Sequence, residues 1–523
     1  MKKSCCSFDG NKFDLIIVGG GINGVGIARD AAGRGLKVLL CEQDDLGSHT
    51  SSSSSKLIHG GFRYLEQYEF GLVSKALAER EVLLRSAPHI ISPVRFVMPH
   101  VDSLRPVWLI RIGLFLYDHL DFGKRKLLPS SRVVKLAQHP AGAPLKSGFI
   151  KGFVFSDACV DDSRLVVLNA MDAKERGATI LTRTKCVSTR RTSTSWFAIL
   201  RDLKTGEEQE VEANCLVNAA GAWVNKFICD QAALKPQQNT RLIKGSHIVV
   251  KKLFEHNYSY AFQHTDGRII FVCPWEQDFT LIGTTDVEFS GDIGEIKISN
   301  DEVNYLCDSI NQYFDQQIQL GDVVWSYAGV RPLLDDESSD LSGVTRDYKL
   351  EIDTDGAPMM SIYGGKITTY RKLAEDALTK LKSVIDIKQS NWTNRDAPLP
   401  GGDIKDADFS GFLSDFQKQF PWLPDELAHR YARNYGTRAQ QVLGRAKSLN
   451  DLGEDIGDGL YAAELDYLIN NEWALTEEDI LWRRSKLGLS IGPVAISNLN
   501  SWLKDRKLEG MIDVRAHGEP VSA

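Results

Sequence analysis

Three glycines near the N-terminus have the spacing of a turn that holds a dinucleotide. An apolar run at residues 13–18 leads directly into Gly19, Gly21 and Gly24, and residues 25–32 continue with the pattern of a helix. The first glycine makes a tight turn, the second lets a pyrophosphate approach the backbone, and the third lets the helix pack against the strand. The motif predicts dinucleotide binding, but it does not choose between NAD and FAD.

Polar residues after this turn extend the predicted cofactor site. A second apolar strand at residues 37–41 ends in Glu42, whose carboxylate is placed to bind ribose hydroxyls. Serines fill positions 51–55. Such a run is usually a flexible linker, but directly after a ribose-binding strand its hydroxyls and amides can line a long cofactor. Gly60 then allows a close approach of the backbone.

Several stretches, in this order along the chain, resemble a known family. Residues 14–42 (DLIIVGGGINGVGIARDAAGRGLKVLLCE), 51–66 (SSSSSKLIHGGFRYLE) and 73–90 (VSKALAEREVLLRSAPHI) are similar to the FAD-dependent glycerol-3-phosphate dehydrogenases, within the D-amino-acid-oxidase type of flavoproteins. The likeness continues through residues 241–247, 282–286, 328–332, 345–348 and 364–371, so it covers nearly the whole chain. Several independent motifs in the right order make the resemblance specific.

The resemblance implies an α/β fold built in three parts. These are a Rossmann-like FAD-binding domain of the D-amino-acid-oxidase type, an inserted substrate domain made largely of an antiparallel sheet, and a C-terminal helical domain. Strand-like runs at short spacing between residues 241 and 282, and helical periodicity after a proline-glycine stretch at 397–402, fit this plan. The expected segments are 13–95, 151–240 and 341–395 for the FAD-binding domain, 96–150 and 241–340 for the substrate domain, and 396–523 for the helical domain.

FAD is the cofactor that the resemblance implies. A strand at residues 212–217 runs into Ala220 and Gly221, which alone would read equally well as an ordinary buried strand with a glycine turn. Gly364 and Gly365 precede a helix whose free amides could face the anionic edge of the reduced flavin. The full set of expected cofactor contacts is Gly19, Gly21, Asn23, Gly24, Glu42, Ser51, Ser55, His59, Gly60, Ala220, Gly221, Gly364, Gly365, Lys366 and Thr368.

The implied substrate, sn-glycerol 3-phosphate, has a dianionic phosphate that arginine and lysine bind well. The expected substrate contacts are Arg63, Tyr64, Thr284, Arg331 and Arg346. A single arginine is usually a solvated surface charge, but these lie in glycine-flanked or turn-like motifs that match the family. The motif favours Arg331 most. Lys366 would either add charge beside the flavin or grip the phosphate, and the sequence does not decide between the two.

Oxidation of a secondary alcohol requires a group that accepts the hydroxyl proton while the hydride leaves. His247 is the expected base, because imidazole titrates near physiological pH and the family places this residue close to the flavin. His59 is the rival candidate, although its position beside Gly60 suits cofactor packing better. The expected catalytic residues are His247, Arg331 and Lys366.

Composition excludes several other classes of protein. The 523 residues are 43% hydrophobic and 25% charged, which is typical of a globular enzyme and not of a disordered chain. A net charge of -7 provides no global positive field for nucleic acid, so we expect no nucleic-acid partner. The nine cysteines include no CxxC pair, which indicates reduced thiols in a cytosolic setting and no metal site. No signal peptide, mitochondrial transit peptide or EF-hand loop is visible. We therefore expect the bacterial form of the family that the chain resembles.

Electrons must leave the flavin, and the resemblance makes membrane quinone the expected acceptor. This predicts a cytoplasmic enzyme that is peripherally bound to the inner face of the cell membrane. The apolar segment 107–120, followed by the basic residues 124–126, could lie on an anionic membrane surface or form a buried helix. An oxidase that uses O2, an amino-acid oxidase and a non-catalytic flavin-binding protein are the alternatives. The oligomeric state stays open, with a homodimer among the alternatives.

Overall fold

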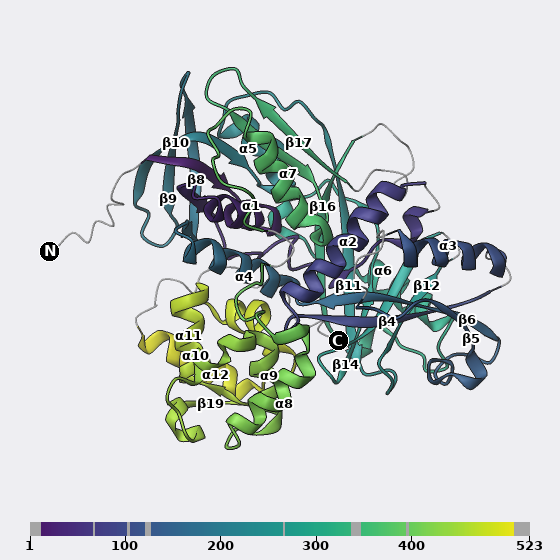
Figure 1. Ribbon diagram of the computed structural model, residues 1–523. Helices are drawn as coiled ribbons and strands as arrows, with labels where there is room; N and C mark the ends of the chain where they lie inside the picture. Colours follow the sequence, from purple (N-terminus) through teal and green to yellow (C-terminus); the bar gives the residue numbers. More distant parts are fainter. Residues whose placement is uncertain are drawn as a thin grey trace.

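The computed structural model describes residues 12–65, 68–101, 105–120, 127–264, 267–335, 347–393 and 397–506, without the side chain of Arg63. Figure 1 shows two sheet-containing units and a helical domain that lies beneath the first unit and beside the second. The helices are α1 (Ile22–Gly33), α2 (Phe70–Ser86), α3 (Val107–His119), α4 (Asp162–Glu175), α5 (Val224–Asp230), α6 (Asn300–Asn311), α7 (Tyr370–Leu381), α8 (Phe409–Gln419), α9 (Asp425–Tyr435), α10 (Ala439–Leu443), α11 (Ala462–Glu472) and α12 (Pro493–Asp505).

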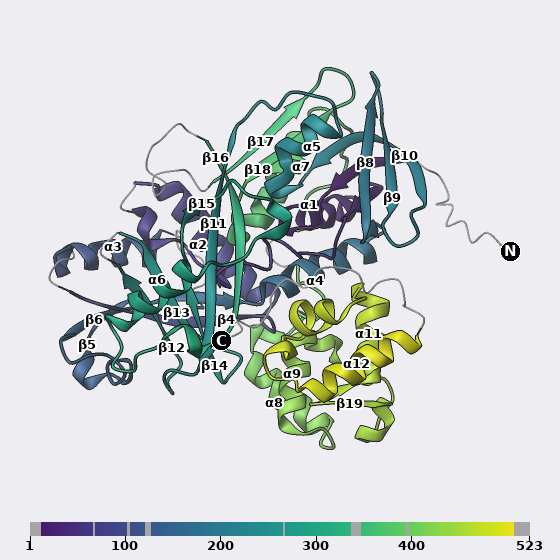
Figure 2. The same ribbon diagram turned by 180° about the vertical axis from the view of Figure 1, so that it is seen from behind.

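The first sheet has a parallel centre. Its strands lie in the order β17-β18-β10-β1-β2-β7, and the pairs β18–β10, β10–β1, β1–β2 and β2–β7 are parallel. Helices α1 and α4 pack together beside this sheet (Figure 2). The strands are β1 (Lys12–Val18), β2 (Val38–Cys41), β7 (Thr179–Leu181), β8 (Thr184–Arg191), β9 (Trp196–Asp202), β10 (Glu208–Asn218), β17 (Tyr348–Asp353) and β18 (Met359–Gly364).

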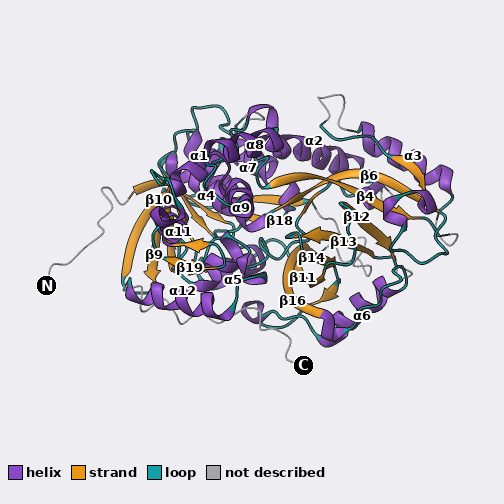
Figure 3. Cartoon of the chain, turned by 90° about the horizontal axis from the view of Figure 1, so that it is seen from below, coloured by secondary structure: helices purple, strands orange, loops and turns teal. Residues whose placement is uncertain are grey.

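The second sheet is mostly antiparallel and spreads across the other half of the molecule (Figure 3). Its long strand β11 pairs with β14, β15 and β16, while β12 joins β4 by a parallel pairing. Residues 240–251, within the region where the sequence predicted strand-like runs at short spacing, form one long strand, β11. The strands are β3 (Leu57–Ile58), β4 (Ile91–Pro99), β5 (Arg132–Lys135), β6 (Lys151–Val160), β11 (Thr240–Lys251), β12 (Tyr258–Gln263), β13 (Ile269–Trp275), β14 (Phe279–Gly283), β15 (Val287–Glu288) and β16 (Val323–Leu334).

The chain crosses between the two units at strand ends. Strands β4 and β6 pair along nine residues of each, so both belong to the second sheet, whereas α4 packs on α1 of the first unit. We therefore propose that the domain boundaries lie at Ile91 and after Val160, in place of the expected boundaries after residues 95 and 150. The expected boundaries cut through β4 and left β6 outside its own sheet.

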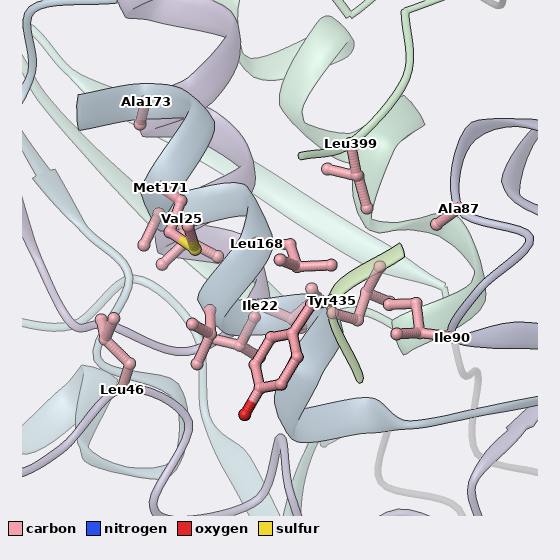
Figure 4. Close-up of a cluster of buried hydrophobic side chains, with 14 of the residues drawn as sticks. Ile22, Val25, Leu46, Ala87, Ile90, Leu168, Met171, Ala173, Leu399 and Tyr435 are labelled. Carbon is pink, nitrogen blue, oxygen red and sulfur yellow. The ribbon is translucent and has the colours of Figure 1, made fainter. Parts of the chain in front are cut away.

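The C-terminal domain shares its hydrophobic core with the first unit. Figure 4 shows Ile22 and Val25 of α1, Leu168 and Met171 of α4, and Tyr435 of α9 in one cluster of buried side chains. A two-stranded sheet, β19 (Asp455–Gly457) with β20 (Leu460–Tyr461), and a π-helical turn, Asp479–Arg484, complete this domain. Among the described residues, none of the helices combines the length and the apolarity that crossing a bilayer requires.

Candidate active site

The glycine turn is built by close packing of backbone against backbone. Gly19 follows β1 with a φ of +112°, a conformation that residues with a side chain rarely adopt. A Cβ atom at Gly19 would lie 2.5 Å from the carbonyl oxygen of Ala219, which follows the neighbouring strand β10. A Cβ atom at Gly24, in the first turn of α1, would collide with the carbonyl oxygen of Gly19. Glycine is therefore required at both positions, as the motif predicts.

Hydrogen bonds hold this turn against the next strand. The Glu42 carboxylate at the end of β2 accepts from the amides of Gly20 at 2.6 Å and Asp44 at 2.8 Å, and burial raises its pKa. The Ser51 hydroxyl accepts from the amide of Ile22 at 3.0 Å, at the N-terminus of α1. Both side chains thus fix the backbone that a pyrophosphate would approach. The sequence predicted a contact with the ribose for Glu42, and its bond to Gly20 is an additional role.

A cavity of about 260 Å³ opens at the carboxyl ends of β1, β2 and β10. In a doubly wound sheet this is where nucleotides bind. Six of the expected cofactor residues line it together with Trp223 and Lys226: Gly19, Gly21, Glu42, Ser51, Ala220 and Gly221. A glycine cradle beside such a cavity fits the adenosine and pyrophosphate part of FAD. The residues were found from local motifs, although 199 positions separate Gly21 from Ala220.

The serine run crosses from this cavity to the second sheet. The Thr50 hydroxyl donates to the carbonyl oxygen of Val330 at 2.7 Å, and Gly329 leaves the space that the Ser53 backbone and side chain occupy. The Ser55 hydroxyl then lies 2.9 Å from Nε2 of His247. The run is therefore an ordered wall between the two units, and not a flexible linker.

His247 stands on a face of the second sheet that glycines keep clear. It pairs with Gly283 of β14 on one side and with Tyr327 of β16 on the other. A Cβ atom at Gly283 would collide with the imidazole, and the Tyr327 ring stacks on it at 4.8 Å between centroids. Only 3% of His247 is exposed. Burial, and then the charges of Lys56 and Arg331, hold its pKa well below 6.5, so the ring is neutral at neutral pH.

Arg331 lies four positions after Tyr327 on β16, an even number, and therefore shares the same face of the sheet. A Cβ atom at Gly245 would collide with its guanidinium and would lie 2.8 Å from the Thr284 hydroxyl. The guanidinium donates to the carbonyl oxygen of Thr285 at 3.1 Å and pairs with Asp286 at 2.7 Å. Thr284, Arg331 and His247 are thus gathered around two glycines on β11 and β14.

A second cationic group comes from the end of β18. The Lys366 ammonium lies 3.6 Å from the centre of the Tyr64 ring. The two glycines before it have φ values of +69° and +99°, and the Asn23 amide donates to the carbonyl oxygen of Gly364 at 3.2 Å. This bond joins β18 to the first turn of α1. The loop that carries Lys366 is therefore tied to the dinucleotide turn.

The remaining expected residues lie where the segment after β3 meets the turn just before α7. The His59 amide donates to the Thr368 hydroxyl at 3.4 Å, and the His59 ring contacts Phe271 edge-on. The Gly60 amide donates to the Tyr117 hydroxyl at 2.8 Å. The Arg63 side chain and the whole of Arg346 lie outside the described residues, so their predicted substrate contacts stay predictions.

Sequence reasoning missed two residues of this site. Lys56 is buried, pairs with Asp162 at 2.8 Å and faces the Tyr327 ring at 4.9 Å. Tyr327 stacks on His247, and its hydroxyl donates to the carbonyl oxygen of Ser54 at 2.7 Å. The position of Lys56 next to the serine run could have identified it as a site residue. Nothing in the sequence identifies Tyr327, because its role depends on the pairing of β11 with β16.

Comparisons with known proteins agree with this geometry. Residues 14–371 match the family model described as FAD dependent oxidoreductase, and residues 393–500 match the C-terminal domain of alpha-glycerophosphate oxidase. A glycerol-3-phosphate dehydrogenase of Pseudomonas aeruginosa is 52% identical over 94% of this chain and 95% of its own length. The aerobic glycerol-3-phosphate dehydrogenase of Escherichia coli is 49% identical over 94% and 97% of the two chains.

Two further similar proteins are a dehydrogenase named for a different sugar-alcohol phosphate and a dehydrogenase whose structure was solved with FAD. A D-erythritol 1-phosphate dehydrogenase of Brucella abortus is 49% identical over 95% of this chain and 98% of its own length. The structure of the glycerol-3-phosphate dehydrogenase from Bacillus halodurans, complexed with FAD, superposes with a TM-score of 0.76 at 26% identity, covering 95% and 90% of the two chains. The predicted fold class and the predicted cofactor, FAD, are confirmed.

The packing at Gly24 generates a test of the cofactor site. We expect Gly24→Ala to weaken FAD binding by at least about tenfold, because the added methyl group would displace the Gly19 turn. Gly71→Ala is the matched control, since Gly71 also lies in the first turn of a helix, and a Cβ atom there meets nothing within 4 Å. Equilibrium dialysis gives the affinity of both apoproteins for FAD. Equal affinities would contradict the role assigned to the turn.

Proposed function

Because this chain belongs to the family of FAD-dependent oxidoreductases, we propose that it oxidises sn-glycerol 3-phosphate to dihydroxyacetone phosphate and passes the electrons to membrane quinone. One observation carries the proposal. A neutral histidine and a fixed arginine share one face of the second sheet, cleared by Gly245 and Gly283, and the serine run joins this face to the dinucleotide cavity. An acceptor of a hydroxyl proton therefore lies beside an anchor for a phosphate.

Arg331 is the proposed phosphate anchor. Its guanidinium is held by Thr285 and Asp286, so little side-chain entropy is lost when a phosphate binds. Lys366 would add positive charge around the same anion, and the same stays a prediction for Arg63 and Arg346, whose side chains lie outside the described part of the structure. A substrate amine would gain nothing from such groups, which argues against an amino-acid oxidase.

His247 is the proposed base. FAD, when bound, accepts the hydride that leaves the carbinol carbon. The neutral imidazole accepts the hydroxyl proton at one ring nitrogen, while Ser55 and the stacked Tyr327 fix the plane of the ring. Its Nδ1 atom has no hydrogen-bond partner among the described residues, and we propose that this nitrogen receives the proton.

Flavin reduction tests the proposed substrate. We expect anaerobic mixing of the FAD-loaded protein with glycerol 3-phosphate to bleach the oxidised-flavin absorbance, because the site supplies both anchor and base. A quinone analogue should restore the colour quickly and O2 slowly. D-erythritol 1-phosphate, tested in parallel, has the same phosphate and is the substrate named for a relative 49% identical.

Each of these reactions also has an outcome that would overturn the assignment. Absence of bleaching with glycerol 3-phosphate would remove it as the substrate, and faster bleaching by D-erythritol 1-phosphate would replace it with the four-carbon phosphate. Rapid recolouring by O2, with no effect of the quinone analogue, would make the protein an oxidase.

The assignment of the base predicts a rate effect and a pH effect. His247→Asn should slow the limiting rate of flavin reduction by about 10²–10⁴-fold, with a much smaller change in substrate affinity. Because the pKa of His247 lies well below 6.5, the rate for the unaltered protein should hold from pH 8 down to 6.5 and fall only at lower pH. Stopped-flow absorbance measures both. His59→Asn is the control, and a larger loss there would make His59 the base.

We propose that helix α3 makes the contact with the membrane. Trp108, Ile112 and Phe115 are 63%, 49% and 60% exposed and lie on one side of the helix, while Ile110 and Leu114 are buried beneath it. Neighbouring β5 adds exposed positive charge at Arg132 and Lys135, and a hydrogen bond of 2.8 Å from Ser131 to Asp118 ties it to the end of α3. Residues 124–126, which the sequence singled out, lie outside the described residues. An apolar face beside basic groups suits an anionic bilayer surface.

Vesicle binding checks this contact. The triple variant Trp108→Ser, Ile112→Ser, Phe115→Ser should lose most of its co-sedimentation with vesicles that contain an anionic lipid, while anaerobic flavin reduction stays unchanged. Val494→Ser, which alters a 74% exposed residue of α12, should bind the vesicles as the parent does. Unchanged co-sedimentation of the triple variant would contradict the assignment of α3.

A further inference from the structure

One short segment of the C-terminal domain contacts both walls of the predicted cofactor site. This segment, residues 479–486, is called the C-terminal clamp below. Its first six residues form the π-helical turn Asp479–Arg484, which directs Arg483 and Arg484 toward the same carboxylate, that of Asp45. Arg483 Nε lies 2.6 Å from Asp45, and Arg484 binds both oxygens of Asp45 at 2.7 and 2.8 Å. The side chains of Asp45 and Arg484 are fully buried.

Asp45 belongs to the loop that holds the dinucleotide turn. Glu42, three residues earlier, accepts from the Gly20 amide at 2.6 Å, and the Gly47 amide donates to the carbonyl oxygen of Gly20 at 3.0 Å. Leu46 is fully buried in the cluster of Figure 4. The position of Asp45 therefore determines where the loop presents its backbone to Gly20.

The other end of the clamp supports the serine run. Lys486 donates to Asp161 at 2.9 Å and to the Ser163 hydroxyl at 2.6 Å. Asp162, which lies between them in sequence, accepts from the Ser54 hydroxyl at 2.7 Å and from Lys56 at 2.8 Å. The clamp thus fixes the start of α4, and α4 fixes the serine run.

Trp482, in the middle of the clamp, contacts β16, the strand that pairs with the strand of His247. Its ring stacks on Trp325 of β16 at 4.5 Å and an interplanar angle of 12°. Trp325 contacts Tyr327 at 4.9 Å, and Tyr327 stacks on His247. The eight residues of the clamp therefore contact the loop beside the glycine turn, the start of α4 that supports the serine run, and strand β16.

Because the Asp45 carboxylate is buried, its contacts with Arg483 and Arg484 determine the position of the loop that contains it. A carboxylate that is removed from water is stable only when cations and hydrogen bonds compensate the lost hydration. Without Arg483 and Arg484, Asp45 would keep no cation that the structure shows binding it, so the loop would have to move until water reached the carboxylate. That movement would carry Glu42 and Gly47 away from Gly20.

We propose that the C-terminal clamp retains FAD. It holds both walls of the cofactor site from a domain that contributes no residue to the cavity beside the glycine turn. Docking of this domain and binding of FAD are then linked equilibria, and each stabilises the other by the same factor. The proposal rests on FAD binding, which the family shows, and does not depend on the identity of the substrate.

The affinity of the apoprotein for FAD, measured by quenching of free FAD fluorescence, tests the clamp. Arg484→Met should weaken FAD binding by at least about tenfold, since a buried carboxylate loses its bidentate partner. Arg430→Met is the matched control, because it breaks a bidentate pair with the buried Glu464 inside the same domain, at 2.6 and 2.7 Å, without contact to Asp45. Its FAD affinity should stay within about twofold of the parent, even though its unfolding midpoint in urea also falls.

A variant on the other side of the contact keeps the test decisive if Arg484→Met does not fold. Asp45→Asn changes no residue of the C-terminal domain and should also weaken FAD binding, while the double variant should lose less than the sum of the two single losses. Parent-like FAD affinity in Asp45→Asn would overturn the proposal. Equal loss of affinity in Arg484→Met and Arg430→Met would also overturn it, because the effect would then reflect general destabilisation.

Discussion

The contact of backbone with backbone at the Gly19 turn is the constraint on which the rest of this structure depends. The parallel strands β1 and β10 end side by side, and the carbonyl oxygen of Ala219 comes so close to Gly19 that no side chain fits between them. A cavity is left at the strand ends, where nucleotides bind in doubly wound sheets, and the chain matches the family of FAD-dependent oxidoreductases. Everything else is placed relative to this point, because the serine run leads from it to the second sheet.

Glycines also shape the proposed catalytic face of the second sheet, because they leave room for the side chains beside them. Gly245 of β11 pairs with Gly329 of β16, and Gly283 of β14 pairs with His247, on the face that carries His247 and Arg331. Each clears space for a neighbour: the guanidinium, the imidazole and the serine run. The same burial that fixes the imidazole lowers its pKa and keeps it able to accept a proton. Position and protonation state therefore have one physical origin.

The sequence predicted what depends on local pattern. The turn, Glu42 and the serine run follow one another within about 40 residues, and the βαβ unit constrains them all. His247 could be named from its motif, but its stack on Tyr327 depends on pairing between strands 80 positions apart. The bond between Asp45 and Arg484 joins residues 439 positions apart, and no periodicity in either segment reveals it. The different boundary that we propose near β6 has the same origin, since its pairing with β4, which the sequence does not reveal, assigns that strand to the second sheet.

The proposed reaction depends on hydride transfer from the carbinol carbon of glycerol 3-phosphate to FAD. Isotopic substitution at this carbon tests that step. In single-turnover stopped-flow experiments, the FAD-loaded protein is mixed anaerobically with glycerol 3-phosphate that carries hydrogen or deuterium at C2. We expect the deuterated substrate to bleach the flavin measurably more slowly, because the C2–H bond breaks in the step that reduces FAD. Bleaching at the same rate for both substrates, under conditions where the chemical step limits reduction, would contradict it, as would no bleaching at all.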